Sequence, residues 1–357
     1  MKNGSFVFDA HTGFWDASKE NCKNRFGEAF IETFYAFQTG FSPAGEPKWI
    51  MDYETQFRKV DPDWYLEEMF IKGDSDMTIL STQVLMDFYH TGFTNADRNK
   101  QMIARAPERI IGLGGVDPRM PNALEELERQ VKECGMKGFK WYTAEWRGQS
   151  RGWSANDPMV FPLYEKCIEL GIKNMHFHKG PAVEPLSLQK FDVRDIDEPA
   201  WLYPELNFII DHVGLPRLDD FCWIAARCPN VYGSLAVANM FVHNSPRRFA
   251  EVMANLLFWL GPERIVWGTD FPIWYPQWLL DDFMEFELPE DLKAEYKVDL
   301  TEETKKKIIG GNIARLYNID IDSKLKAIEN DEIAQRKREY ATSHPATETG
   351  VAGTTSR

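Results

Sequence analysis

The strongest constraint on the fold is the regular alternation of short apolar runs with amphipathic segments between residues 77 and 270. A run such as Met77–Ser81 has the length and apolar content of a strand. The segments between such runs carry apolar residues at helical spacing, as Leu124, Leu127 and Val131 do. Strands that alternate with helices form a parallel sheet, since each helix returns the chain to the same end of the sheet.

Eight expected strands complete this pattern. They cover residues 5–10, 77–81, 109–114, 137–142, 172–178, 206–212, 230–235 and 264–270. Eight such units predict an α/β fold of the (β/α)8 TIM-like barrel type. The alternative is an open doubly wound sheet, but no Gly-x-Gly-x-x-Gly motif follows an early strand to support a dinucleotide crevice.

Two segments fall outside the alternation. Residues 12–60, after the first strand, form a long irregular stretch whose many aromatic residues predict an ordered lid or insertion. At the other end, residues 323–340 are charged, and residues 341–357 are rich in Thr, Ser, Gly and Ala, which predicts a flexible tail. We therefore expect a barrel domain over residues 1–321 and a C-terminal tail over residues 322–357.

Composition narrows the class of protein. The net charge of −14 argues against a nucleic-acid or anionic-membrane partner. The five cysteines are an odd number without Cys-x-x-Cys spacing, which favours a reducing compartment. No signal peptide and no apolar run of about 18 residues is evident, so we expect a cytoplasmic protein that does not span a membrane.

Polar residues gather where the expected strands end, and in this architecture active sites lie at the C-terminal ends of the strands. Four of the seven histidines are among them. Imidazoles and carboxylates together are ligands for zinc, manganese or iron. The candidate site residues, in chain order, are Asp9, His11, His176, His178, His212 and Asp270.

The pattern suggests a role for most of these residues. We interpret His11 and His178 as metal ligands, and Asp270 as a buried carboxylate that needs a cation. His212 is either a proton-transfer residue or a ligand, because histidine titrates near neutral pH. His176 shares a strand face with His178, so it either binds the metal or supports a ligand.

Lys140, at the end of the fourth strand, is a further candidate. Its ammonium group either contacts a substrate carboxylate or is solvated.

Five stretches of the sequence resemble the amidohydrolase superfamily. The resemblance is strongest to the branch that holds aminocarboxymuconate-semialdehyde decarboxylase and γ-resorcylate decarboxylase. It extends over residues 6–319, and its motifs occur in the family's order on the expected strands. They are His11, Met175–Gly180, Ile210–Gly214, Trp267–Pro272 and Gly311–Tyr317.

This resemblance implies a barrel that binds one divalent metal ion, with zinc as the first choice and manganese or iron as alternatives. By matching position, His178 and Asp270 would be ligands, and His212 would polarise water or substrate. The branch does not depend on a carbamylated lysine on strand four. Relatives of this kind are often dimers, so the resemblance also implies a homodimer.

The first strand departs from the family pattern. The family often has Asp-x-His-x-His, whereas this chain has Asp9-Ala-His11-Thr-Gly13, so Gly13 stands where a second histidine is expected. Three outcomes are open. Asp9 binds the metal beside His11, or His176 supplies the missing imidazole, or the metal is bound weakly or not at all.

The predicted activity is non-oxidative decarboxylation of an aromatic or unsaturated carboxylic acid. The same residues would also suit a hydrolase of an ester, thioester, lactone or amide, in which a metal-bound water attacks the carbonyl. A remote alternative is a metal-free binding protein. The aromatic insertion, with Phe88–Gly92 and Trp141–Trp146, would either cover the barrel mouth and bind a ring-bearing small molecule or form a dimer interface.

Overall fold

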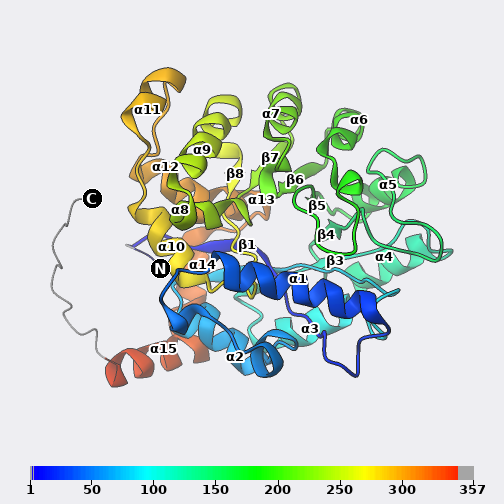
Figure 1. Ribbon diagram of the computed structural model, residues 1–357, viewed down its shortest axis with the longest axis horizontal. Coiled ribbons are helices and arrows are strands. Elements are labelled where there is room, and N and C mark those ends of the chain that lie inside the picture. The colour runs from blue at the N-terminus through cyan, green and yellow to red at the C-terminus, as the bar shows by residue number, and fades with distance from the viewer. Residues whose placement is uncertain (1, 3, 345–357) are drawn as a thin grey trace.

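A computed structural model describes residue 2 and residues 4–344. These residues contain an eight-stranded parallel sheet in which the strands follow one another in chain order (Figure 1). The strands are β1 (Phe8–Thr12), β2 (Met77–Leu80), β3 (Ile110–Gly114), β4 (Gly138–Trp141), β5 (Asn174–His178), β6 (Asn207–Asp211), β7 (Val231–Ser234) and β8 (Ile265–Val266).

Hydrogen bonds between β1 and the segment after β8 bring the two edges of the sheet together. Ala10 N donates to Trp267 O over 2.9 Å, and Asp270 N donates to His11 O over 2.9 Å. The predicted (β/α)8 barrel is therefore confirmed. The last strand is shorter than expected, because β8 ends at Val266 and Asp270 adopts a left-handed backbone with φ of 62°.

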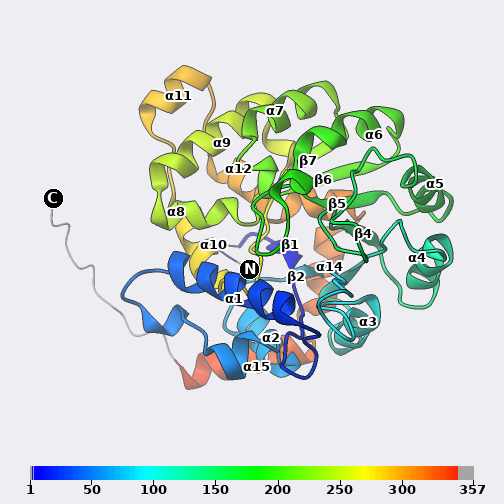
Figure 2. The ribbon, with the colours of Figure 1, turned by 45° about the vertical axis from the view of Figure 1, so that its right-hand side comes forward.

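Helices surround the strands in both views of the ribbon (Figures 1 and 2). They are α1 (Arg25–Phe41), α2 (Pro62–Leu66), α3 (Ala96–Arg105), α4 (Ala123–Lys132), α5 (Phe161–Glu169), α6 (Asp197–Leu202), α7 (Leu218–Arg227), α8 (Phe241–Asn244), α9 (Pro246–Leu260), α10 (Pro276–Glu285), α11 (Glu290–Tyr296), α12 (Glu302–Lys306), α13 (Asn312–Leu316), α14 (Ile321–Ile328) and α15 (Glu332–Ser343). No helix in this described part is long and apolar enough to cross a membrane.

Alternation along β5 decides which side chains face the interior of the barrel. The Phe177 ring stacks on Trp141 of β4, with centroids 6.0 Å apart, and contacts Tyr164 of α5. Phe177 therefore faces the helices. Because successive side chains on a strand point to opposite faces, His176 and His178 both point into the barrel.

The insertion after β1 is ordered and contains α1, a 17-residue helix. Our expectation of an irregular stretch was wrong here. Asn24 caps the helix by accepting a hydrogen bond from Phe26 N. Phe30, Phe34, Phe37 and Phe41 recur at helical spacing and give α1 one apolar face, and Figure 2 shows α1 lying in front of the strands.

The C-terminal segment begins with two helices, α14 and α15, that follow the barrel. Asp331, the N-cap of α15, forms an ion pair with Arg109 beside β3, with Nε and Oδ2 2.6 Å apart. This contact attaches α15 to the barrel. Residues 345–357, which make up most of the predicted flexible tail, lie outside the described residues.

Phe30→Ala tests how firmly α1 is packed. The Phe30 ring is fully buried and lies 4.6 Å from Phe34 and 5.1 Å from Phe93, measured between centroids. Its loss leaves a cavity, so we expect the free energy of unfolding in urea to fall by about 3–5 kcal/mol. Phe258→Ala is the matched control, since Phe258 is 53% exposed, and should change the value by less than about 0.5 kcal/mol. Equal effects of the two variants would contradict the packing described for α1.

Candidate metal centre

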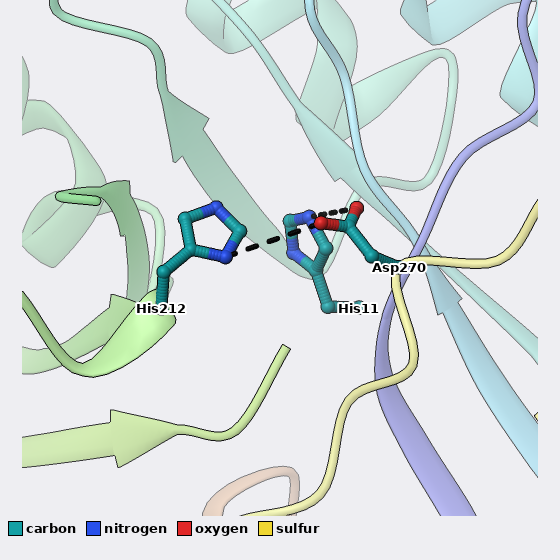
Figure 3. A group of neighbouring side chains, drawn as sticks. All are labelled: His11, His212 and Asp270. Atoms are coloured by element: carbon teal, nitrogen blue, oxygen red, sulfur yellow. Dashed lines mark ion pairs between the residues drawn. The ribbon is translucent and has the colours of Figure 1, made fainter. Parts of the chain in front are cut away.

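Three side chains converge at the C-terminal end of the barrel. His11 comes from β1, His212 follows β6 and Asp270 follows β8 (Figure 3). One ligand atom from each lies within 4.8 Å of the others. His11 Nε2 is 3.2 Å from Asp270 Oδ1, and His212 Nδ1 is 3.9 Å from Asp270 Oδ2. The structure thus brings together three of the residues predicted from the strand ends.

His178 adjoins this group through His212, and the two rings are oriented by backbone carbonyls. His178 Nε2 donates to Pro181 O over 2.9 Å, and His212 Nδ1 donates to Ala236 O over 3.0 Å. A carbonyl oxygen only accepts, so these contacts fix the tautomer of each neutral ring. The remaining nitrogens, His178 Nδ1 and His212 Nε2, lie 2.9 Å apart, and their lone pairs then face each other.

Two facing lone pairs need a cation between or beside them. Burial lowers the pKa of His212 to about 4 and lowers the pKa of His178 well below its usual value, which disfavours a proton there. Burial acts to raise the pKa of Asp270, but the charge and hydrogen bond of His11, with the charges of His212 and Lys140, together lower it, so the carboxylate is ionised. Neutral imidazoles beside an ionised carboxylate are the donors that a divalent metal requires, and the residues fit such an ion.

Asp211, at the end of β6, lies beneath this group and was not among our candidates. Its carboxylate is fully buried and forms an ion pair with Lys140 of β4. Asp211 Oδ2 is also 3.3 Å from His11 Nδ1, and Oδ1 is 3.8 Å from His176 Nδ1. The expectation of a solvated Lys140 is therefore wrong, since its ammonium group is enclosed in the barrel.

The charge of Asp211 acts directly on His11. Burial acts to lower the pKa of His11, but Asp211 and Asp270 raise it overall to about 9. Burial acts to raise the pKa of Asp211, yet His11 and Lys140 hold it well below its usual value. A ligating histidine commonly donates its second ring N–H to a carboxylate, and Asp211 is placed for that role. Side chains alternate between the two faces of a strand, so the sequence of β6 could have shown that Asp211 points into the barrel.

Asp9 and His176 make other contacts. Asp9 Oδ1 accepts from His11 N over 3.0 Å and from Thr269 N over 3.1 Å, and Oδ2 accepts from the Thr269 hydroxyl. His176 Nε2 lies 3.0 Å from the Tyr317 hydroxyl. Neither residue belongs to the group formed by His11 and its two neighbours, and their roles as ligands stay predictions.

The position of the missing family histidine is filled by a neighbouring ring. A Cβ atom on Gly13 would lie 3.0 Å from the Trp15 side chain. Trp15 is itself fixed, since its indole stacks on Phe93 with centroids 5.3 Å apart and donates to Phe57 O. A larger residue at position 13 would have to displace this indole.

The backbone around the site is held in unusual conformations. His212 has φ of 68° and Asp270 has φ of 62°, in the left-handed region that costs a non-glycine residue about 1–3 kcal/mol. Gly180 permits the close approach of the neighbouring loop, because a Cβ atom there would lie 2.5 Å from His212 Cβ. Strained residues of this kind concentrate at functional sites.

A small cavity of about 120 Å³ opens onto His178, His212 and Asp270. Apart from Gln83, its other lining residues are apolar. They come from α1 and from the loops after β5, β7 and β8, and they are Phe34, Phe37, Phe41, Pro181, Val183, Val237, Met240, Ile273 and Trp274.

Comparisons with known proteins match this fold. The family model for amidohydrolases matches residues 8–319. A 2-amino-3-carboxymuconate-6-semialdehyde decarboxylase of Dictyostelium discoideum is 23% identical over 305 residues, which are 73% of this chain and 77% of that protein.

Among the solved structures that share the fold, two illustrate the likeness. An uncharacterized TIM-barrel protein from Bordetella bronchiseptica has 17% identity and a TM-score of 0.62, covering 87% of this chain and 98% of that one. A dihydroxybenzoic acid decarboxylase from Polaromonas sp. JS666, with bound manganese and the inhibitor 2-nitroresorcinol, has 18% identity and a TM-score of 0.56, covering 88% and 97%. At these identities the likeness establishes the fold alone.

The chain belongs to the amidohydrolase family, since the family model spans nearly the whole barrel. The resemblance inferred from the strand-end motifs is confirmed.

Asp211→Asn tests the buried ion pair. It leaves the Lys140 ammonium without a counter-charge inside the barrel, so we expect the free energy of unfolding to fall by about 3–5 kcal/mol. The double variant Lys140→Met/Asp211→Asn removes both charges and should recover most of that loss. If adding Lys140→Met to Asp211→Asn lowered the free energy of unfolding further instead of restoring it, the two residues would be acting independently. That result would refute the pairing.

Proposed function

We propose that this protein is a metal-dependent decarboxylase of a small aromatic carboxylic acid. The observation that carries the proposal is the pair of facing imidazole lone pairs on His178 and His212, set beside the ionised Asp270 at the floor of an apolar cavity. The curated relative and the manganese-bound neighbour, both decarboxylases by name, support the same reaction class.

The residues that would hold the ion are His11, His178, His212 and Asp270. When bound, a divalent cation supplies Lewis-acid stabilisation for negative charge on the substrate's oxygens and orients them. Asp211 supports His11 through its charge, with Oδ2 3.3 Å from Nδ1, and the Pro181 and Ala236 carbonyls hold the other two rings in their tautomers. We propose zinc, and manganese is the alternative.

Decarboxylation of an aromatic acid requires a proton at the carbon that loses carbon dioxide. Asp270 lines the cavity and is ionised, so it can accept a proton from a substrate hydroxyl or a water and return it to that carbon. The bond to the carboxyl carbon then breaks, its electron pair restores the ring, and carbon dioxide leaves. His212 lines the same cavity, but its Nδ1 proton donates to the Ala236 carbonyl, so His212 would contribute through the lone pair of Nε2 and not as a proton donor to the substrate.

The apolar residues of the cavity lining, here called the roof, favour decarboxylation by excluding water from the substrate. Phe34, Phe37 and Phe41 of α1, with Trp274, are among the apolar residues that line the cavity. Trp274 Nε1 donates to Phe37 O over 3.3 Å, which connects the roof to the loop after β8. A carboxylate enclosed by apolar side chains loses hydration, while the neutral carbon dioxide product does not need it.

Asp270→Asn tests the function. Purified wild-type protein reconstituted with zinc or manganese should bind about one ion per chain and release carbon dioxide from hydroxybenzoates. The variant keeps the size of the side chain but loses the charge that binds the ion and transfers the proton. We expect carbon dioxide release to fall by at least about 10³-fold and the metal content to fall with it.

Asp281→Asn is the matched control, because Asp281 lies on α10 and does not line the cavity. The carbon dioxide release of this variant should equal that of the wild type. Unchanged turnover in Asp270→Asn would contradict the mechanism. Hydrolysis of aryl esters or thioesters without any carbon dioxide release would favour the hydrolase alternative instead.

A further inference from the structure

A second cavity lies at the end of the barrel opposite the metal centre. It has a volume of about 560 Å³, and its lining comes from the beginnings of β2 to β5 and from the segment that follows α13. Most of the lining residues are apolar, among them Met77, Ile111, Met136, Ile172 and Ile319. A cavity of this size with apolar walls suits a small-molecule ligand.

Every charged residue in this lining is a lysine, although the chain as a whole has a net charge of −14. The three are Lys137, Lys173 and Lys324, and no aspartate or glutamate from the described part of the chain lines the cavity. Lys324 is paired, since its Nζ lies 2.7 Å from Glu108 Oε2. The side chains of Lys137 and Lys173 form no hydrogen bond or ion pair within residues 2 and 4–344. Two unpaired cations at one cavity attract an anion.

The two unpaired lysines also lie next to each other. The parallel register of β4 and β5 places Phe139 opposite Met175. The same offset, carried back to the residues that immediately precede the two strands, places Lys137 beside Lys173. Like charges at directly opposed positions of neighbouring strands repel each other. An anion bound between the two ammonium groups would turn this repulsion into attraction.

We propose that this cavity binds a phosphate monoester with an apolar body, whose phosphate pairs with Lys137 and Lys173. A phosphate monoester carries a charge of about −1.5 to −2 at pH 7, which matches two ammonium groups, whereas a carboxylate neutralises only one. The apolar body packs against the walls of the cavity and leaves water. This site is separate from the metal centre, so the proposal does not depend on the proposed reaction.

Three probes test the proposal in calorimetric titrations of the metal-reconstituted full chain at pH 7. They are octyl phosphate, octanoate and inorganic phosphate. Octyl phosphate should bind at one site per chain. Octanoate should bind at least about tenfold more weakly, because it lacks the second charge. Inorganic phosphate should also bind at least about tenfold more weakly, because it buries no apolar surface.

Two substitutions locate the bound phosphate. Lys137→Gln and Lys173→Gln each remove one ammonium group and keep a polar side chain, so each should weaken octyl phosphate binding by at least about tenfold. Lys100→Gln is the matched control, because Lys100 is exposed on α3 and does not line the cavity, and this variant should bind octyl phosphate as the wild type does.

Urea unfolding without ligand shows whether the two ammonium groups are unpaired. Loss of one of two repelling charges should leave the unfolding midpoint of Lys137→Gln equal to that of the wild type or higher. A lower midpoint would show that Lys137 is paired within the chain, which contradicts the proposal.

The titrations can also overturn the proposal. Absence of octyl phosphate binding to the wild type would refute it, and so would equal affinity for octanoate. Undiminished binding in the two lysine variants would place the phosphate elsewhere, for example on the metal ion, and would refute it as well. None of these results depends on carbon dioxide release, so this site and the proposed reaction are tested separately.

Discussion

The buried carboxylate of Asp211 is the constraint on which the site depends. It pairs with Lys140 from β4 and lies 3.3 Å from His11 Nδ1 of β1, so it joins opposite walls of the barrel. A buried ion pair adds little stability compared with apolar packing, but removing one partner is costly. This interaction therefore serves orientation more than stability. It directs Nε2 of His11 toward Asp270, the carboxylate whose negative charge would bind the cation.

The other parts of the centre follow the same logic of fixed orientation. Asp9 binds Thr269 and so holds the loop that carries Asp270 in its left-handed conformation. Backbone carbonyls fix the rings of His178 and His212. Each functional side chain is thus positioned by a contact that does not involve the substrate, which is how a preorganised site avoids reorganisation during reaction.

Sequence reasoning found the barrel because strand and helix periodicities are local signals, and it found His11, His212 and Asp270 because parallel strands end at one edge. It missed α1, where the four phenylalanines from Phe30 to Phe41 had the spacing but were interpreted as part of an irregular loop. It also missed the role of Asp211, since a lysine on β4 and an aspartate on β6 become partners only when the sheet closes.

Anomalous diffraction from crystals soaked in manganese shows directly whether the donors at the end of the barrel bind one divalent cation. We expect a single strong peak in contact with Asp270 and with imidazole nitrogens from at least two of His11, His178 and His212. An empty site at saturating manganese, or a peak bound only by surface carboxylates, would contradict it.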